Sequence, residues 1–228
     1  MPVRLSRMER REKTRQDLLT AAETCFITRG FHATSVDEVA ERAGYTKGAI
    51  YSNFASKEDL FFGVYQRRID HVLTDVVPGL RQAGAVRAFD TLATGTIQRR
   101  ESDDGWLAVF FEFWAHVLRH PELRGRFAES HTRFLEPLTD AVRQLAAERG
   151  RSLPSDVTPF QVVLAWNAME VGLGLERLTQ PQDVDVELAH RMCWLLLDAV
   201  VGPGQPAAGS DSDSDSDSDS EQKNRSTR

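Results

Sequence analysis

A carboxylate and two histidines follow one another at four-residue intervals in a segment that reads as a helix. Glu112, His116 and His120 would lie along one strip of that helix, because residues four apart share a helix face. Two histidines with this spacing can share a metal ion that a carboxylate also binds. An ordinary solvent-facing edge or a set of polar anchors in a pocket would have the same spacing. No second ligand cluster supports the metal interpretation, so we expect no bound metal and no cofactor.

Signatures of enzymes are missing from the sequence. It contains no GxSxG, HExxH or P-loop pattern. Gly172 and Gly174 do not complete a dinucleotide-binding GxGxxG, because Arg177 stands in place of the third glycine. We therefore expect a protein that is not an enzyme. An all-helical enzyme or metal-binding protein is the alternative, and turnover of a bound compound would favour it.

The distribution of charge indicates a different kind of partner. The chain has a net charge of −6, but its first 68 residues hold 12 Lys and Arg against 9 Asp and Glu. Residues 69–210 hold 13 against 19, and residues 211–228 hold 3 against 6. A basic arm ahead of a folded domain can contact phosphates or a groove of DNA, although such arms are often only solvated. Six basic side chains lie within the first 15 residues: Arg4, Arg7, Arg10, Arg11, Lys13 and Arg15.

Three short helical segments with two tight connections carry the clearest functional signal. An apolar stripe runs to Gly30, a second segment ends at Gly44, and a third covers Thr46 to Phe54. The sequence from Ser35 to Glu38 fits a capping box, and Thr46 is a plausible N-cap. This arrangement predicts a helix-turn-helix, whose second helix enters the major groove of DNA with its first residues.

The sequence from Gly30 to Leu60, above all GAIYSNF and SKEDL, resembles the DNA-binding signature of the TetR family of transcriptional regulators. The resemblance covers about residues 12–72. It implies that Lys47 and Gly48 face base edges and that Ala49 can touch a thymine methyl group. The full set of DNA contacts that it implies is Ser35, Tyr45, Thr46, Lys47, Gly48, Ala49, Tyr51, Asn53 and Lys57.

Three aromatic residues of this motif have two interpretations. Tyr45 stands where the family commonly has a small aliphatic residue, and it would either extend the base contacts or only pack. Tyr51 and Phe54 could belong to the core of the helix bundle. For Tyr51 we expect DNA contact, because a tyrosine can bury its ring and still present its hydroxyl group.

The remainder of the chain is also predicted to be helical, so the expected fold class is all-α. A fourth helix begins at Ser56, and further helices are predicted at about 86–100, 105–119, 121–149, 157–179 and 184–201. The composition after Gly202, with alternating Asp and Ser, predicts a disordered tail. We thus predict a DNA-binding domain over 12–72, a helical effector-binding and dimerisation domain over 73–201, and a tail over 202–228.

The helix predicted at 105–119 is apolar almost all round, so several of its sides should be buried. The family resemblance places it among the helices that enclose an effector cavity, and its aromatic side chains suit a hydrophobic small molecule. Plain core packing is the alternative for each of them. The candidate effector residues are Trp106, Phe110, Phe113, Trp114, His116, Trp166 and Glu170.

Together these features predict a homodimeric repressor that binds a palindromic operator. The resemblance implies dimerisation through helices 157–179 and 184–201, which would place two recognition helices about 34–36 Å apart, one turn of DNA. A purely intrachain core is the alternative. A small hydrophobic effector would move the fourth helix and release the operator. A constitutive DNA-binding protein without an effector remains a further alternative.

The sequence also bears on location. No apolar run approaches the ~18 residues that a membrane span needs, and the basic N-terminus has no secretory signal. Cys25 and Cys193 lack CxxC spacing, as is typical of reduced thiols. We therefore expect a cytoplasmic protein with no membrane partner.

Overall fold

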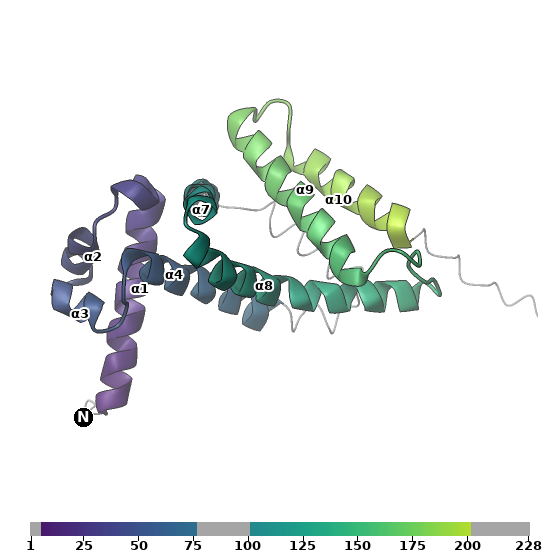
Figure 1. The fold of residues 1–228 in the computed structure, drawn as a ribbon. Coiled ribbons are helices and arrows are strands. Elements are labelled where there is room, and N and C mark those ends of the chain that lie inside the picture. The colour runs from purple at the N-terminus through teal and green to yellow at the C-terminus, as the bar shows by residue number, and fades with distance from the viewer. Residues whose placement is uncertain (1–5, 77–100, 202–228) are drawn as a thin grey trace, which may run out of the picture.

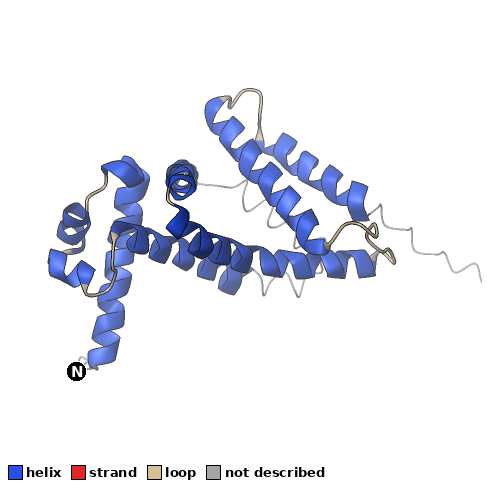
Figure 2. Cartoon of the chain, in the orientation of Figure 1, coloured by secondary structure: helices blue, strands red, loops and turns tan. Residues whose placement is uncertain are grey.

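The computed structural model describes residues 6–76 and 101–201, where every regular element is a helix (Figure 1). Figure 2 shows these helices joined by short loops, which confirms the all-α fold class. The helix predicted at 86–100 and the predicted tail lie outside the described residues. The elements are α1 (Arg7–Ala33), α2 (Val36–Ala43), α3 (Lys47–Tyr51), α4 (Lys57–His71), a π-helical turn (Val72–Val76), α7 (Glu101–Arg119), α8 (Pro121–Glu148), α9 (Pro159–Thr179) and α10 (Val186–Val201).

Capping chemistry determines where the short helices begin and end. Ser35 Oγ accepts the N–H of Glu38 at 3.2 Å, and the Glu38 carboxylate accepts the N–H of Ser35 at 3.3 Å. Thr46 Oγ1 accepts the N–H of Ala49 at 3.3 Å. Gly44 ends α2 with φ of +72°, a conformation that favours glycine. The predicted capping box, N-cap and end of α2 are therefore confirmed.

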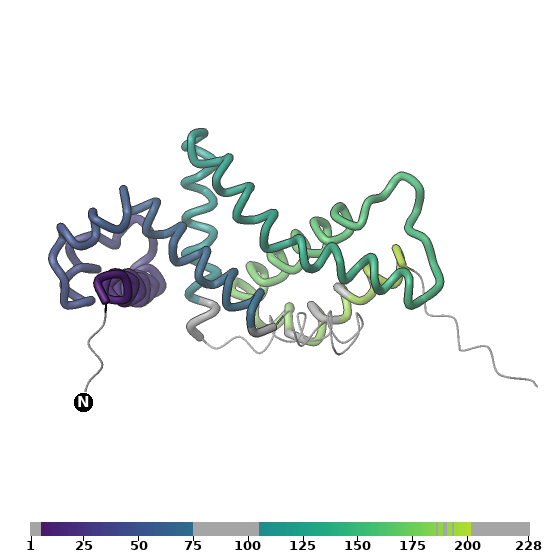
Figure 3. Tube along the Cα trace, turned by 90° about the horizontal axis from the view of Figure 1, so that it is seen from below, coloured from purple at the N-terminus to yellow at the C-terminus, as the bar shows by residue number. Residues whose placement is uncertain are grey.

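The helices form an elongated arrangement. α1 packs against α2, α4 and α7, whereas α9 packs between α8 and α10. Figure 3 shows the bundle of α1, α2 and α3 at one end and α9 and α10 at the other, with α4 and α7 between them and α8 running from α7 along α9 to the far end. In the described ranges no helix is both long enough and apolar enough to cross a membrane.

The helices are held together by two clusters of buried side chains, which we call the junction core and the distal core. The junction core joins the bundle and α4 to α7 and the start of α8, and the distal core joins the rest of α8 to α9 and α10. The α7 and α8 members of the junction core are Val109, Phe110, Phe113, Val117 and Phe127. The distal core consists of Leu135, Leu138, Val142, Leu145, Ala146, Val162, Val163, Trp166, Leu197 and Val201. The junction core thus extends across the predicted domain boundary at residue 72.

Two glycines allow α1 and α7 to approach each other closely. Gly30 has φ of +82° and interrupts the helix that begins at Arg7, as predicted, and one further short turn leads to Ala33. A Cβ atom on Gly30 would lie 2.7 Å from both carboxylate oxygens of Glu112. A Cβ atom on Gly105 would lie 2.7 Å from Cγ2 of Ile27. α7 begins at Glu101 instead of at the predicted residue 105, and Gly105 lies inside the helix, where it makes room for α1.

Candidate nucleic-acid interface and effector region

The start of α3 faces open space. Lys47 is exposed, and its Nζ lies 2.9 Å from Oδ2 of Asp37, which is exposed too. The hydrogen bond to Asp37 raises the pKa of Lys47. A Cβ atom on Gly48 would meet only Thr46 Oγ1, at 3.7 Å. Since exposed ion pairs contribute little stability, Lys47 can exchange Asp37 for another hydrogen-bond acceptor at small cost.

The opposite side of α3 anchors it to the bundle. Ile50 and Phe54 are buried in the junction core, so Phe54 belongs to the core of the helix bundle and both side chains hold α3 in place. The Tyr51 side chain is 52% exposed. The alternative that Tyr51 belongs to the bundle core is therefore wrong. The solvent-exposed face of α3 carries Lys47, Gly48 and Tyr51.

Tyr45 and Asn53 also have structural partners. Tyr45 is half-buried against the junction core and donates its hydroxyl hydrogen to Asp17 Oδ2 at 2.8 Å. Asn53 Nδ2 donates to the carbonyl oxygen of Ala49 at 2.8 Å. The structure thus supports the packing interpretation of Tyr45, and DNA contacts by Tyr45 and Asn53 stay predictions.

Lys57 binds the turn between α1 and α2. Its Nζ donates to the carbonyl oxygens of Phe31, His32 and Thr34 at 3.0–3.2 Å. It also lies 4.6 Å from the ring centroid of Phe31. An ammonium group has three N–H donors, so these carbonyls use all of them. The predicted DNA contact of Lys57 would require the side chain to leave these three carbonyl groups.

The strip of Glu112, His116 and His120 joins α7 to the DNA-binding bundle. The Glu112 carboxylate accepts the N–H of Phe31. Nε2 of His116 lies 3.4 Å from Oε1 of Glu58, and the His116 and His120 rings stack with centroids 3.9 Å apart. Burial is the main reason that the pKa of His116 is lowered. Residues 6–76 and 101–201 contain no group of His, Cys, Asp and Glu that could hold a metal ion.

The seven predicted effector residues do not form one site. Phe113 is fully buried in the junction core and stacks on Phe61 with ring centroids 4.1 Å apart. Trp106, Phe110 and Trp114 pack against the same core. Trp166 belongs to the distal core, Glu170 is half-buried on α9, and His116 faces Glu58. The prediction of a single pocket lined by all seven is therefore not what the structure shows.

A chain of polar groups that no sequence motif indicated lies where α4, α8 and α9 meet. Tyr65 Oη lies 3.2 Å from Nδ1 of His131, and Nδ2 of Asn167 lies 3.5 Å from Nε2 of the same ring. The Trp114 ring centroid is 5.7 Å from that of His131. Burial lowers the pKa of His131 and raises the pKa of Tyr65. No motif could reveal these residues, because each comes from a different helix.

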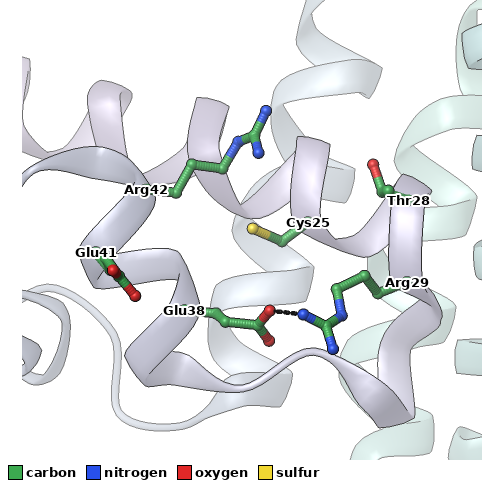
Figure 4. Close-up of a pocket in the computed structure, with 6 residues that line it drawn as sticks. All are labelled: Cys25, Thr28, Arg29, Glu38, Glu41 and Arg42. Atoms are coloured by element: carbon green, nitrogen blue, oxygen red, sulfur yellow. Dashed lines mark hydrogen bonds and ion pairs between the residues drawn. The ribbon is translucent and has the colours of Figure 1, made fainter.

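A separate hollow of about 350 Å³ lies between α1 and α2. Figure 4 shows the guanidinium group of Arg29 paired with the carboxylate of Glu38 beside this hollow. Burial raises the pKa of the Cys25 thiol. The charged lining of this hollow differs from the predicted aromatic pocket, and the lining contains none of the predicted effector residues. The lining residues are Cys25, Thr28, Arg29, Glu38, Glu41 and Arg42.

Comparisons with known proteins cover both halves of the chain. Residues 18–64 match the family described as bacterial regulatory proteins, tetR family. Residues 83–202 match the family described as BetI-type transcriptional repressor, C-terminal. A solved structure from Rhodococcus sp., described as a TetR-family transcriptional regulator, has a TM-score of 0.70 at 22% identity. It covers 83% of this chain and 99% of that chain, and this likeness concerns the fold.

Two curated relatives are similar in sequence. The HTH-type transcriptional activator FasR of Mycolicibacterium smegmatis is 38% identical over 106 residues, which is 46% of this chain and 42% of FasR. The match therefore spans less than half of that relative. The HTH-type transcriptional repressor AcnR of Corynebacterium diphtheriae is 28% identical over 172 residues, 75% of this chain and 84% of AcnR.

Proposed function

The chain belongs to the TetR family of bacterial regulatory proteins, and we propose that it is a homodimeric repressor that a small hydrophobic effector releases from a palindromic operator. As a member of this family it is a DNA-binding transcriptional regulator. In the proposal, residues 12–72 bind the operator and residues 73–201 bind the effector and dimerise. The tail predicted over residues 202–228 lies outside the described residues.

The main observation behind this proposal is that the start of α3 is exposed while the other side of the same segment is buried in the bundle. Ile50 and Phe54 fix the helix, while Lys47 and Tyr51 extend from its free side. A helix held in this way can enter the major groove with its first residues, where Lys47 would give up Asp37 for a base edge. The proposed contacts are Ser35, Tyr45, Thr46, Lys47, Gly48, Ala49, Tyr51, Asn53 and Lys57.

Apolar side chains on the outside of α9 and α10 support dimerisation. Leu164, Leu175 and Leu195 are 43%, 39% and 55% exposed. Gly172, on the same pair of helices, has open space in front of its Cα atom. Burying these groups against a second copy would remove apolar surface from water. A twofold dimer of this kind would present two copies of α3 to a palindromic operator.

The effector site that the contacts favour lies where α4, α7, α8 and α9 meet. Trp106, Phe110 and Trp114 supply aromatic surface there, and the chain from Tyr65 through His131 to Asn167 supplies hydrogen-bonding groups. Such a mixture suits a hydrophobic molecule with one polar group. Binding there would shift α4 and α7, and both touch the DNA-binding bundle.

The test is a salt-titrated binding assay on the DNA upstream of the chain's own gene. Wild type is compared with Lys47→Ala/Tyr51→Ala and with Arg143→Ala, which also removes an exposed, ion-paired cation but lies on α8. We expect sequence-selective binding by wild type and Arg143→Ala, and its loss in the double variant. If a genome-wide selection with wild type enriched no sequence, operator binding would be excluded.

Transcription with purified components then separates the regulatory directions. A decrease in transcript on adding the protein supports repression, and an increase would identify an activator instead. Hydrophobic compounds are next screened for loss of operator binding. A compound that releases wild type but not Trp114→Ala would support the proposed effector site.

A further inference from the structure

The first turns of α1 extend beyond the helix bundle. Leu18 is the first buried residue of this 27-residue helix. The preceding turns, from Arg7 onward, cover about 16 Å at about 1.5 Å per residue. Figure 1 shows this end of α1 running past α3. A cap holds the end in helical form, because Ser6 and Glu9 form a capping box.

The acidic side chains of these turns are engaged within the protein. The Glu9 carboxylate accepts the N–H of Ser6 at 2.7 Å, and that of Glu12 accepts Gln16 Nε2 at 2.8 Å. Asp17 lies 2.6 Å from Lys13 Nζ and also accepts the Tyr45 hydroxyl. The hydrogen bonds of Glu9 with Ser6 lower the pKa of this carboxyl. These acids therefore leave the neighbouring arginines without acidic partners.

Three arginines of the same turns remain available. Arg7, Arg10 and Arg11 are exposed, and their side chains make no hydrogen bond or ion pair with any residue that the structure describes. Arg15, one turn further on, donates to the carbonyl oxygen of Asn53 at 3.3 Å and lies over the Phe54 ring. Arg15 therefore holds this part of α1 next to the end of α3.

The free arginines continue the face of α1 that packs on the bundle. Arg7 and Arg11 precede the buried Leu18 by 11 and 7 residues, which are about three and two helical turns. Both therefore project on the side of α1 that carries Leu18 and Ala22, with Arg10 at its edge. This is the side against which the helix-turn-helix lies. DNA bound to the start of α3 would pass beside these arginines.

We propose that Arg7, Arg10 and Arg11 form a second DNA contact, which binds backbone phosphates beside the base pairs that α3 reads. A guanidinium group matches a phosphate with two parallel hydrogen bonds. An α-helix is about 10–12 Å wide, whereas the minor groove is about 6 Å wide. The helical form of this segment therefore points to phosphates rather than to the floor of the minor groove. The proposal rests on operator binding through α3.

The test compares two variants with equal charge loss. The DNA is a duplex selected from a random library with wild-type protein, and affinity is measured over a range of salt concentrations. Arg7→Ala/Arg11→Ala removes two of the arginines and keeps the helix, since alanine is the best helix former. Arg143→Ala/Arg151→Ala removes two exposed arginines, one near the C-terminal end of α8 and one in the loop that follows it. Circular dichroism verifies that both variants remain helical.

For Arg7→Ala/Arg11→Ala we expect the slope of log affinity against log salt to become shallower by about 0.9 per lost phosphate contact, or about 3.6 for a dimer that loses four. The control should keep the wild-type slope. A second selection from the random library, now with Arg7→Ala/Arg11→Ala, should enrich the same base sequence as wild type, because phosphate contacts carry no sequence information. Equal slopes for the two variants, or altered base preference in the first, would overturn the phosphate contact. Failure of wild type to prefer its selected duplex over a shuffled one would instead overturn operator binding itself.

Discussion

The junction core and the distal core differ in composition and in what surrounds them. Aromatic rings dominate the junction core, where Phe26, Phe31, Phe61 and Phe113 contact one another across α1, α4 and α7. The distal core is mainly aliphatic, with Trp166 as its only fully buried ring among the described residues. α1 and α7 approach each other closely at Gly30 and Gly105, beside the junction core, whereas exposed leucines lie next to the distal core. The junction core therefore joins two parts of the chain, whereas the exposed leucines beside the distal core form the surface that we propose for dimerisation.

The largest expected effect comes from removing a buried side chain from either core. DNA binding then shows which core connects the DNA-binding bundle to the rest of the chain. Phe113→Ala removes a fully buried ring from the junction core, and Leu135→Ala removes a fully buried side chain from the distal core. We expect losses of about 3–5 and 2–5 kcal/mol in the free energy of unfolding, measured by denaturant titration with circular dichroism. Only Phe113→Ala should also weaken DNA binding at a temperature where both variants are folded. Equal DNA affinities would contradict the coupling role of the junction core.

The outer faces of the two regions should respond differently to a charge. Leu195 on α10 and Leu118 on α7 are 55% and 59% exposed, so Leu195→Glu and Leu118→Glu form a matched pair. An unpaired carboxylate in an interface costs several kcal/mol, so Leu195→Glu should weaken dimerisation by about 100-fold or more. Sedimentation equilibrium measures this change. A dimer that survives Leu195→Glu but dissociates with Leu118→Glu would move the interface to α7.

A pair of glycine variants measures how tightly α7 holds α1. Gly30 and Gly44 both have positive φ, but a Cβ atom on Gly44 has open space around it. Gly44→Ala should cost about 1–2 kcal/mol of stability from backbone strain. Gly30→Ala should cost more, because its backbone region is nearly restricted to glycine and its methyl group displaces the Glu112 carboxylate from Phe31.

Glu112→Ala isolates the contact within this pair. In a double-mutant cycle, combining it with Gly30→Ala should cost less than the sum of the two single changes. Strict additivity in the thermal or denaturant measurements would show that only the backbone strain of Gly30 matters.

The smallest expected effect concerns His131, which lies between the two regions. Burial holds the pKa of its imidazole below the ordinary value of about 6.5. The unfolded chain therefore binds a proton at this position more readily, so the free energy of unfolding should decrease as the pH falls below about 6.5. His131→Gln should make this decrease shallower, measured by urea titration at about pH 5.5 and at about pH 7.5, one pH unit either side of that value. An unchanged slope would show that His131 does not contribute.

Local rules of helix formation explain why much of the fold could be predicted from the sequence. Ser35 with Glu38, Thr46, and Gly44 mark helix ends through contacts that span only a few residues. The same locality made the motif of α2 and α3 recognisable. The start of α7 was predicted at residue 105 instead of at Glu101, because the reason for a glycine inside this helix is the approach of Ile27 from another helix.

The candidate sites depend on contacts between distant residues, which no local pattern encodes. Lys57 binds carbonyl groups 23–26 residues before it, and Glu112 binds an N–H group 81 residues away. The chemistry of Glu112 and His116 was noticed in the sequence, but their partners could not be. Only the packing of α7 against α1 and α4 shows that these side chains connect the two parts of the protein.

The continuous length of α1 makes it a lever. Arg7 at one end is separated from Gly30 at the other by about 34 Å of helix, at about 1.5 Å per residue. A tilt of about 5° at the Gly30 end would sweep the first turn through about 3 Å, close to the 3.4 Å between successive base pairs of DNA. A displacement at α7 too small to disrupt the packing of the bundle would thus be magnified into a misfit of about one base pair at the far end.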